Sequence, residues 1–278
     1  MIERDYMQVD GRRDHSFRVP RPDLSEETGA PNACTDCHAD RDAAWAAEQV
    51  AAWYPDSERR GPHFSQVFAV GHRFPADNKD RLMQIAEDGS AAAIVRATAL
   101  EMLRGVTDEA VAERGSDLLV DPSALVRENA IGLQQGAPPT DRVRRLTPLL
   151  EDQMRSVRVA AARSLIGVPA HELPETSMGP YRGAMADFRN SLSAKTDFPE
   201  IHLVLGGTAL VMRNASAAEA AFREAVTLDP QLEEAWSMIV QMRLATDDVV
   251  GAREVLSEGL SHNPSSLVLI QLDLSLRG

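Results

Sequence analysis

The feature that most constrains this chain is a set of anchors that recurs with a fixed 31-residue spacing. The anchors are a Val-Arg pair, an alanine and a glycine: Val95-Arg96, Val126-Arg127 and Val157-Arg158; Ala99, Ala130 and Ala161; Gly105, Gly136 and Gly167. A recurring unit of this length is one supersecondary element that buries its apolar face on the next copy. We expect each unit to contain a short helix, a turn such as Asp121-Pro122, and a second helix that ends at the glycine.

A second, 34-residue spacing replaces the first after about residue 175. It relates small and large apolar positions: Ala184, Ala218 and Ala252; Phe188 and Phe222; Pro230 and Pro264. Leu205-Gly206 and Ala225 complete one unit, and Trp236 and Leu256 complete the next. Small residues let paired helices approach, and large ones fill the space between pairs. The copy at Tyr181–Asp197 is degenerate, and Leu267–Leu276 is predicted as the first helix of a further unit or a cap.

These two patterns resemble known helical repeats. The 31-residue units are similar to the short bacterial form of HEAT repeats, and the 34-residue units to tetratricopeptide repeats. The resemblance implies an α-solenoid with surfaces that bind protein or peptide partners. We therefore predict an all-α chain with HEAT-like repeats over residues 78–172 and tetratricopeptide-like repeats over residues 173–278.

Residues 1–77 differ from the repeats and are predicted to form a separate, loop-rich module. They hold four of the seven histidines, both cysteines and two of the three tryptophans. One good helix is expected within them, Asp40–Trp53, with an apolar face formed by Ala43, Ala44, Ala47, Val50 and Ala51.

The chemistry of this module is concentrated in Cys34-Thr35-Asp36-Cys37-His38. In a Cys-x-x-Cys-His motif the two thiols form thioethers with haem vinyl groups and the histidine binds the iron. Cys34 and Cys37 are thus predicted as covalent anchors of haem c, and His38 as the proximal iron ligand. The alternatives are a chance match and a redox cysteine pair, but no strand–helix frame of the thioredoxin kind is visible. Because no other cysteine occurs, a four-cysteine zinc site and a disulfide framework are excluded.

The distal iron ligand is less constrained by the sequence. Among the histidines of the module, His15 is the first candidate and His63 the second, and His72 is a further possibility. Ligation by Met7 is less favoured. The remaining histidines lie in the repeats and are interpreted as packing or solvated side chains: His171, His202 and His262.

Charge and hydropathy exclude several classes of partner. The net charge of −13 disfavours nucleic acid and anionic membrane surfaces. No apolar stretch is long enough to span a bilayer. The N-terminus is charged from Glu3 and lacks the apolar core of a signal peptide. Because haem c is attached outside the cytoplasm, we expect the intact protein to be longer than this chain and to be periplasmic or otherwise exported.

The segments Arg13–Ser25, Pro31–His38 and Trp45–Tyr54 resemble multihaem c-type cytochromes that carry HEAT and tetratricopeptide repeats, and the similarity extends over nearly the whole chain. It implies further haem motifs and a signal peptide upstream. It also implies that His15 or His63 could ligate a haem of a neighbouring domain.

Electron transfer with redox protein partners or neighbouring haem domains, on a helical-repeat scaffold, is therefore the first functional hypothesis. The alternative is a scaffold that binds peptides or proteins and carries a vestigial haem motif. An enzyme, such as part of a multihaem oxidoreductase, has little support, since no paired carboxylates, Ser/His constellation or phosphate-binding loop is apparent.

Overall fold

The chain is almost entirely helical. A computed structural model describes residues 3–6, 10–13 and 20–277, and 74% of the structure is helix and 3% strand. The predicted all-α class is confirmed at this level. The chain forms two compact units, residues 1–137 and 138–278. The division into modules at residues 77 and 172 stays a prediction.

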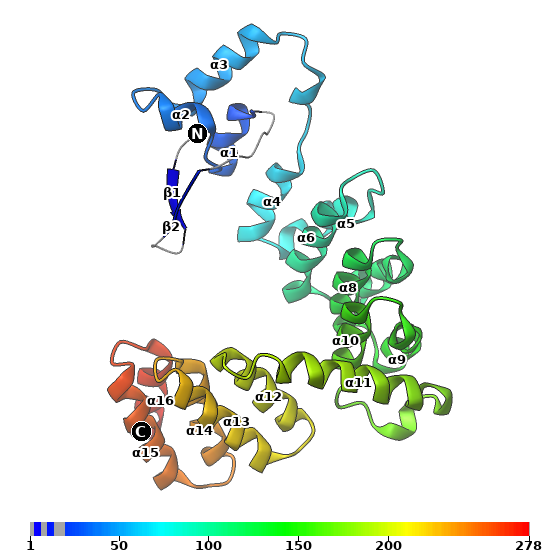
Figure 1. The fold of residues 1–278 in the computed structure, drawn as a ribbon, viewed down its shortest axis with the longest axis vertical. Helices are drawn as coiled ribbons and strands as arrows, with labels where there is room; N and C mark the ends of the chain where they lie inside the picture. Colours follow the sequence, from blue (N-terminus) through cyan, green and yellow to red (C-terminus); the bar gives the residue numbers. More distant parts are fainter. Residues whose placement is uncertain (1–2, 7–9, 14–19, 278) are drawn as a thin grey trace. The chain divides into compact units, whose positions relative to one another are not determined.

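The first unit contains a small hairpin and eight α-helices within its described residues (Figure 1). Strands β1 (Glu3–Tyr6) and β2 (Asp10–Arg13) pair antiparallel. The α-helices are α1 (Ser25–Thr28), α2 (Ala33–Cys37), α3 (Ala43–Trp53), α4 (Phe64–Arg73), α5 (Lys79–Glu87), α6 (Ala93–Leu103), α7 (Glu109–Arg114) and α8 (Ala124–Leu133). The 3₁₀ segments are Pro22–Leu24, Glu58–Arg60, Ala76–Asn78, Arg104–Val106, Gly115–Val120 and Gln134–Gly136.

The core of the first unit lies mostly between α5, α6 and α8, which pack in sequence. Leu82, Leu100, Leu103, Ile131 and Leu133 are completely or almost completely buried there. The preceding segment has far less core, because its buried apolar side chains between residues 20 and 63 are Pro22, Leu24 and Ala46. The motif of interest therefore lies in the most thinly packed part of the described unit.

The helix predicted for Asp40–Trp53 is present but begins later. The Asp42 carboxylate accepts a hydrogen bond from the Trp45 backbone N–H at 2.8 Å, which caps the helix, so α3 begins at Ala43. Its predicted apolar face is only half-buried, and the fully buried residue is Ala46. The expectation of one good helix in this module was also wrong, because α4 adds ten residues of helix capped by His63.

The second unit contains helices and no strand within its described residues. Its α-helices are α9 (Pro139–Leu146), α10 (Arg155–Ser164), α11 (Met178–Ser193), α12 (Pro199–Val211), α13 (Ala215–Leu228), α14 (Glu233–Leu244), α15 (Val249–His262) and α16 (Leu267–Arg277). The 3₁₀ segments are Thr147–Glu151, Ala170–Glu172 and Glu175–Ser177. Within the described ranges of the chain, no helix is both long and apolar enough to cross a membrane.

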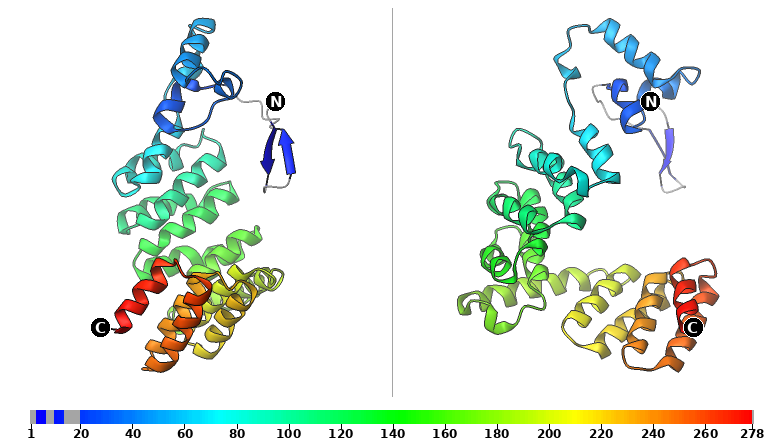
Figure 2. Two further views of the ribbon diagram at one scale, coloured as in Figure 1. Left: turned by 90° about the vertical axis from the view of Figure 1, so that its left-hand side faces the viewer. Right: turned by 180° about the vertical axis from the view of Figure 1, so that it is seen from behind.

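From α12 onward each helix packs on the one that follows it, as both views in Figure 2 make visible. Positions related by the 34-residue spacing have matching burial. Ala218 and Ala252 are completely buried, and Phe222 and Leu256 are each only 1% exposed. Close approach of α12 and α13 depends on Gly206, since a Cβ there would lie 2.5 Å from the Phe222 ring. The predicted use of small residues at helix contacts is therefore confirmed at this pair.

The recurring glycines differ in what they do. Gly167 follows α10 with a φ of +87°, in the left-handed region that ends many helices. Gly136 has no such conformation. It lies in a 3₁₀ turn so close to the Asp108 carbonyl that a Cβ would be 2.5 Å from the oxygen. Both glycines lie three residues beyond the last residue of the preceding helix, close to the predicted helix end, and only Gly167 is left-handed.

Candidate functional site

The Cys-x-x-Cys-His motif forms a short helix and its C-terminal cap. The Asn32 side chain accepts a hydrogen bond from the Thr35 backbone N–H at 3.2 Å and so begins α2. At the other end the His38 backbone N–H donates to the Cys34 carbonyl at 2.9 Å. Cys34 and Cys37 are three residues apart on this turn, and residues with that spacing share one face of a helix. The local fold thus presents both thiols to the same side, with the imidazole directly after them.

Both thiols and the imidazole are accessible. Cys34 is half-buried, Cys37 is exposed, and neither cysteine is in a disulfide. His38 is exposed as well. Among the residues that the structure describes, no hydrogen bond reaches a ring nitrogen of His38. The two sulfur atoms and the imidazole are therefore available for bonding to a ligand.

The His38 ring packs against the Trp45 ring on α3. The ring centroids are 4.9 Å apart and the ring planes are tilted by 56°. A tight turn makes this contact possible, because the Arg41 backbone N–H donates to the His38 carbonyl at 3.0 Å and Asp42 caps α3. The Arg41 guanidinium lies 5.8 Å from the Trp45 ring centroid. Trp45 was not predicted as a site residue; the signal for it was an aromatic residue on the first turn of the helix that follows the motif.

Two polar contacts hold the segment around the motif to the rest of the first unit. The Arg21 guanidinium donates to the carbonyl of Arg59 at 2.7 Å and pairs with Asp23 at 2.9 Å. Gln66 on α4 donates to Glu27 on α1 at 2.8 Å. These contacts compensate in part for the thin apolar core, because they tie together segments that are distant in sequence.

His63, the second candidate for the distal ligand, caps α4. Its Nδ1 accepts a hydrogen bond from the Ser65 backbone N–H at 3.3 Å, and its own backbone N–H donates to Gln66 Oε1 at 3.0 Å. Burial lowers the pKa of His63, and the charge of Arg21 lowers it further against an opposing effect of Asp23. Nδ1 also lies 2.8 Å from the Ser65 hydroxyl oxygen. No ring contact or hydrogen bond joins His63 to His38 within the described segments.

The other candidate ligands are not brought to the motif by any described contact. His15, the first candidate, and Met7 lie outside the described residues. His72 is exposed on α4. In the second unit His202 is buried and hydrogen-bonded to the Thr196 carbonyl at 2.9 Å, and His262 stacks on Trp236. The described residues contain no group of three or more His, Cys, Asp or Glu side chains placed to hold a metal ion.

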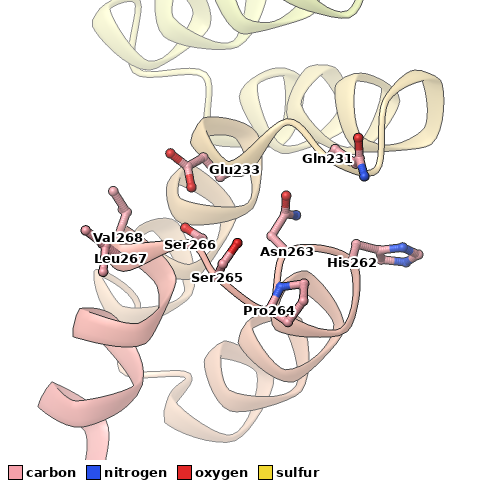
Figure 3. Close-up of a pocket in the computed structure, with 9 residues that line it drawn as sticks. All are labelled: Gln231, Glu233, His262, Asn263, Pro264, Ser265, Ser266, Leu267 and Val268. Carbon is pink, nitrogen blue, oxygen red and sulfur yellow. The ribbon is translucent and has the colours of Figure 1, made fainter.

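A separate cavity of about 550 Å³ lies in the second unit (Figure 3). It is open to solvent at the start of α14 and of α16, and no sequence pattern predicted it. Its lining residues are Gln231, Glu233, His262, Asn263, Pro264, Ser265, Ser266, Leu267 and Val268. No lysine or arginine is among them, and the Asn263 amide already donates to the Pro230 carbonyl at 3.0 Å.

The motif fits haem c in its chemistry and in its surroundings. Two free thiols on one helical turn and an imidazole next to them are the donor set that covalent haem attachment uses. Residues 20–63 bury only Pro22, Leu24 and Ala46 as apolar side chains. A porphyrin bound there would add apolar surface to a segment that has little of its own.

Comparison with known proteins adds no independent identification. No protein-family model matches the chain, and no curated protein matches it. A function for this chain is therefore inferred from the geometry and the chemistry of the Cys-x-x-Cys-His motif.

Proposed function

We propose that this chain is a c-type haem-binding electron-transfer protein with a helical-repeat scaffold for protein interactions. The observation that carries the proposal is the presentation of Cys34, Cys37 and His38 on one accessible helical turn, with both thiols free. This is the arrangement that a covalent haem requires from its protein. The same residues without haem have no evident chemical task.

Each residue of the site has a distinct part in this proposal. Cys34 Sγ and Cys37 Sγ form the two thioether bonds, and His38 supplies the proximal imidazole. When bound, haem c supplies a one-electron iron couple. Trp45 acts as a positioning residue, since its ring packs at 4.9 Å on the His38 ring, whose nitrogens have no hydrogen-bond partner among the described residues. Packing, rather than a hydrogen bond to a ring nitrogen, thus orients the imidazole.

In this proposal the distal iron ligand is a residue outside the Cys-x-x-Cys-His motif. His15 remains the first candidate in the proposal. Ligation through Nδ1 would cost His63 its helix-capping hydrogen bond from the Ser65 N–H. Ligation of a haem on a neighbouring domain by either histidine is part of the same proposal.

The helices beyond residue 77 are proposed to form an α-solenoid of HEAT-like and tetratricopeptide-like pairs. Support comes from equal burial at positions related by the 34-residue spacing and from the sequential packing of α12 to α16. Such a scaffold docks redox proteins or other protein partners. The intact protein is proposed to be exported, because haem c attachment takes place outside the cytoplasm.

Covalent haem is the direct test of this function. The chain should be expressed with an export signal in cells that carry the haem-maturation machinery, and the denatured product examined by the pyridine haemochrome spectrum. We expect haem that stays with the polypeptide, at one per chain, and none on a Cys34→Ala, Cys37→Ala double variant. Absence of covalent haem on the unsubstituted chain would refute the proposal.

The alternative is a peptide-binding or protein-binding scaffold with a vestigial motif. It is favoured by one observation, the exposure of apolar residues such as Leu267 and Leu274 on α16. In that case the double cysteine variant would keep both its folding and its partner binding, and the chain would acquire no haem under the same conditions.

A further inference from the structure

The cavity of the second unit lies between two successive turns, the one that joins α13 to α14 and the one that joins α15 to α16 (Figure 3). Its volume of about 550 Å³ falls within the range of about 300 to 1,000 Å³ that is typical of ligand sites in proteins. The four helices that carry these turns pack on one another. Electron transfer at the Cys-x-x-Cys-His motif makes no use of this cavity.

The Pro230 carbonyl holds the two turns together. It accepts a hydrogen bond from Trp236 Nε1 at 2.9 Å and another from Asn263 Nδ2 at 3.0 Å. Asn263 Nδ2 also donates to the Gly259 carbonyl at 3.2 Å. Because the bond from Asn263 to Pro230 joins residues that are 33 positions apart, the two walls of the cavity are fixed in the chain by itself. A ligand would therefore meet a site that is already formed.

The polar groups at the cavity are mainly hydrogen-bond acceptors. With its amide nitrogen committed to two carbonyls, Asn263 offers the oxygen Oδ1 to a ligand. In Figure 3 the Asn263 amide and the Ser265 hydroxyl point from the α15–α16 turn toward the side that carries Gln231 and Glu233. The Glu233 carboxylate can only accept. The cavity thus favours a ligand that donates several hydrogen bonds.

The negative charge of Glu233 is not balanced within the chain. Its side chain is half-buried at the cavity, whose lining contains no lysine or arginine. Residues 215–277 hold ten acidic and four basic side chains, and the basic residues Arg223 and Arg243 both pair with Glu219. No ion pair reaches Glu233 within the described part of this unit. A cationic ligand would therefore be attracted both by this carboxylate and by the excess of negative charge around it.

We infer that this cavity binds the guanidinium group of an arginine side chain from a partner polypeptide. The planar fork of N–H donors can reach a carboxylate, an amide oxygen and a hydroxyl at the same time. Leu267 and Val268, on the first turn of α16, add an apolar wall to the cavity. The methylene stem of an arginine packs on such a surface while its charged end is hydrogen-bonded.

An anion matches the cavity less well, although α14 and α16 both begin there and helix N-termini attract anions. Glu233 and Glu234 already place two carboxylates on the first turn of α14. At the start of α16 the Ser266 hydroxyl accepts the Leu269 N–H at 3.3 Å. A metal ion is also a poorer match, because the described residues bring no three His, Cys, Asp or Glu side chains together as ligands.

The test is a titration of the isotopically labelled full chain, followed by NMR. The probe is a blocked peptide with one arginine flanked by alanines. Its control is the same peptide with citrulline, which keeps the shape of arginine and lacks the charge. We expect saturable shifts of the backbone amides of residues 231–233 and 262–268. The citrulline peptide should bind about tenfold more weakly or less, because hydrogen bonds to charged groups are the stronger ones.

Two neighbouring glutamates provide matched variants. Glu233→Gln should weaken binding of the arginine peptide about tenfold, because it removes the carboxylate at the cavity. Glu234→Gln should change it by less than about twofold, since Glu234 is exposed on the same first turn and is not part of the lining. Both substitutions remove a first-turn carboxylate, so equal thermal unfolding of the two variants separates a lost contact from a lost fold.

Several results would overturn the inference. They are the absence of saturable binding, equal binding of the arginine and citrulline peptides, and equal effects of Glu233→Gln and Glu234→Gln. Tighter binding of free spermidine than of the peptide would assign the cavity to a small organic cation, and shifts of the same amides with inorganic phosphate would assign it to an anion. The inference does not depend on haem, so the Cys34→Ala, Cys37→Ala double variant should bind the arginine peptide as the unsubstituted chain does.

Discussion

The guanidinium of Arg96 donates to a carboxylate oxygen of Asp121 at 2.6 Å, and both side chains are less than 10% exposed. Arg96 also donates to the Ala86 carbonyl at 2.8 Å. It therefore joins three segments of the first unit: the end of α5, α6 and the turn before α8. At the positions 31 and 62 residues further on, Arg127 and Arg158 donate to the carbonyls of Asp121 and Asp152, in the turns before their own helices. Each of the three arginines thus ties its helix to a preceding segment through a backbone carbonyl.

Removal of either partner should strongly destabilise the first unit. Arg96→Met leaves the Asp121 carboxylate buried without its guanidinium, and the loss of a partner in a buried pair costs about 3 to 5 kcal/mol. Urea denaturation measures the change. Arg104→Met is the control, because its pair with Glu101 is exposed and worth about 0.5 kcal/mol or less. Equal effects of the two substitutions would show that the buried pair has no special role.

Two adjacent glycines on α12, Gly206 and Gly207, allow the close packing of α12 on α13 to be tested. Gly206→Ala should destabilise the second unit by about 1 to 3 kcal/mol, because its Cβ would meet the Phe222 ring at 2.5 Å. Gly207→Ala should be neutral or stabilise by up to about 1 kcal/mol, since nothing lies within 4 Å of that position and alanine favours helix. Thermal unfolding of both variants distinguishes them, and a neutral Gly206→Ala would contradict this close packing.

The role of Trp45 is testable separately from haem attachment. Trp45→Leu leaves both thiols intact, so covalent haem should still form. The looser His38 ring should change the electron paramagnetic resonance g values of the ferric protein, and Trp45→Phe should restore them in part. Trp53→Leu is the control, because Trp53 is 66% exposed at the other end of α3. Attached haem with an unchanged Trp45→Leu spectrum would exclude the positioning role and leave the proposed function standing.

Acidification should weaken the first unit through His63. The folded-state pKa of His63 lies below its ordinary value of 6.5, so the unfolded chain takes up the proton first as the pH falls. Its contribution is therefore complete above pH 6.5 and decreases as the pH drops from there through the folded-state pKa. Protonation of Nδ1 also removes the acceptor for the Ser65 N–H. An NMR titration of the apoprotein should give a midpoint below 6.5, and a midpoint at or above it would contradict the environment described for this ring.

Much of the helical packing was accessible from the sequence, because spacing carries information about burial. Ala218 and Phe222, selected by their 34-residue spacing, are buried as expected, and the helical class follows from the same periodicity. The residues at which helices begin were harder to predict from the sequence. The Asp42 side chain, rather than the run of apolar residues, decides where α3 begins.

The parts of the site that the sequence did not predict depend on contacts between side chains. Trp45 is seven positions from His38, and no periodic pattern marks it, because its role comes from the turn between α2 and α3. The buried pairing of Arg96 with Asp121 was also missed, since a charged residue on a predicted helix is ordinarily assigned to its solvated face.

The most direct test of the central claim is mass spectrometry of the protein isolated from its native host, on the proteolytic peptide that contains Cys34 and Cys37. The proposed function predicts a peptide heavier by one haem, with both sulfur atoms in thioether linkage. A peptide of unmodified mass, in which both thiols react with an alkylating agent, would contradict it.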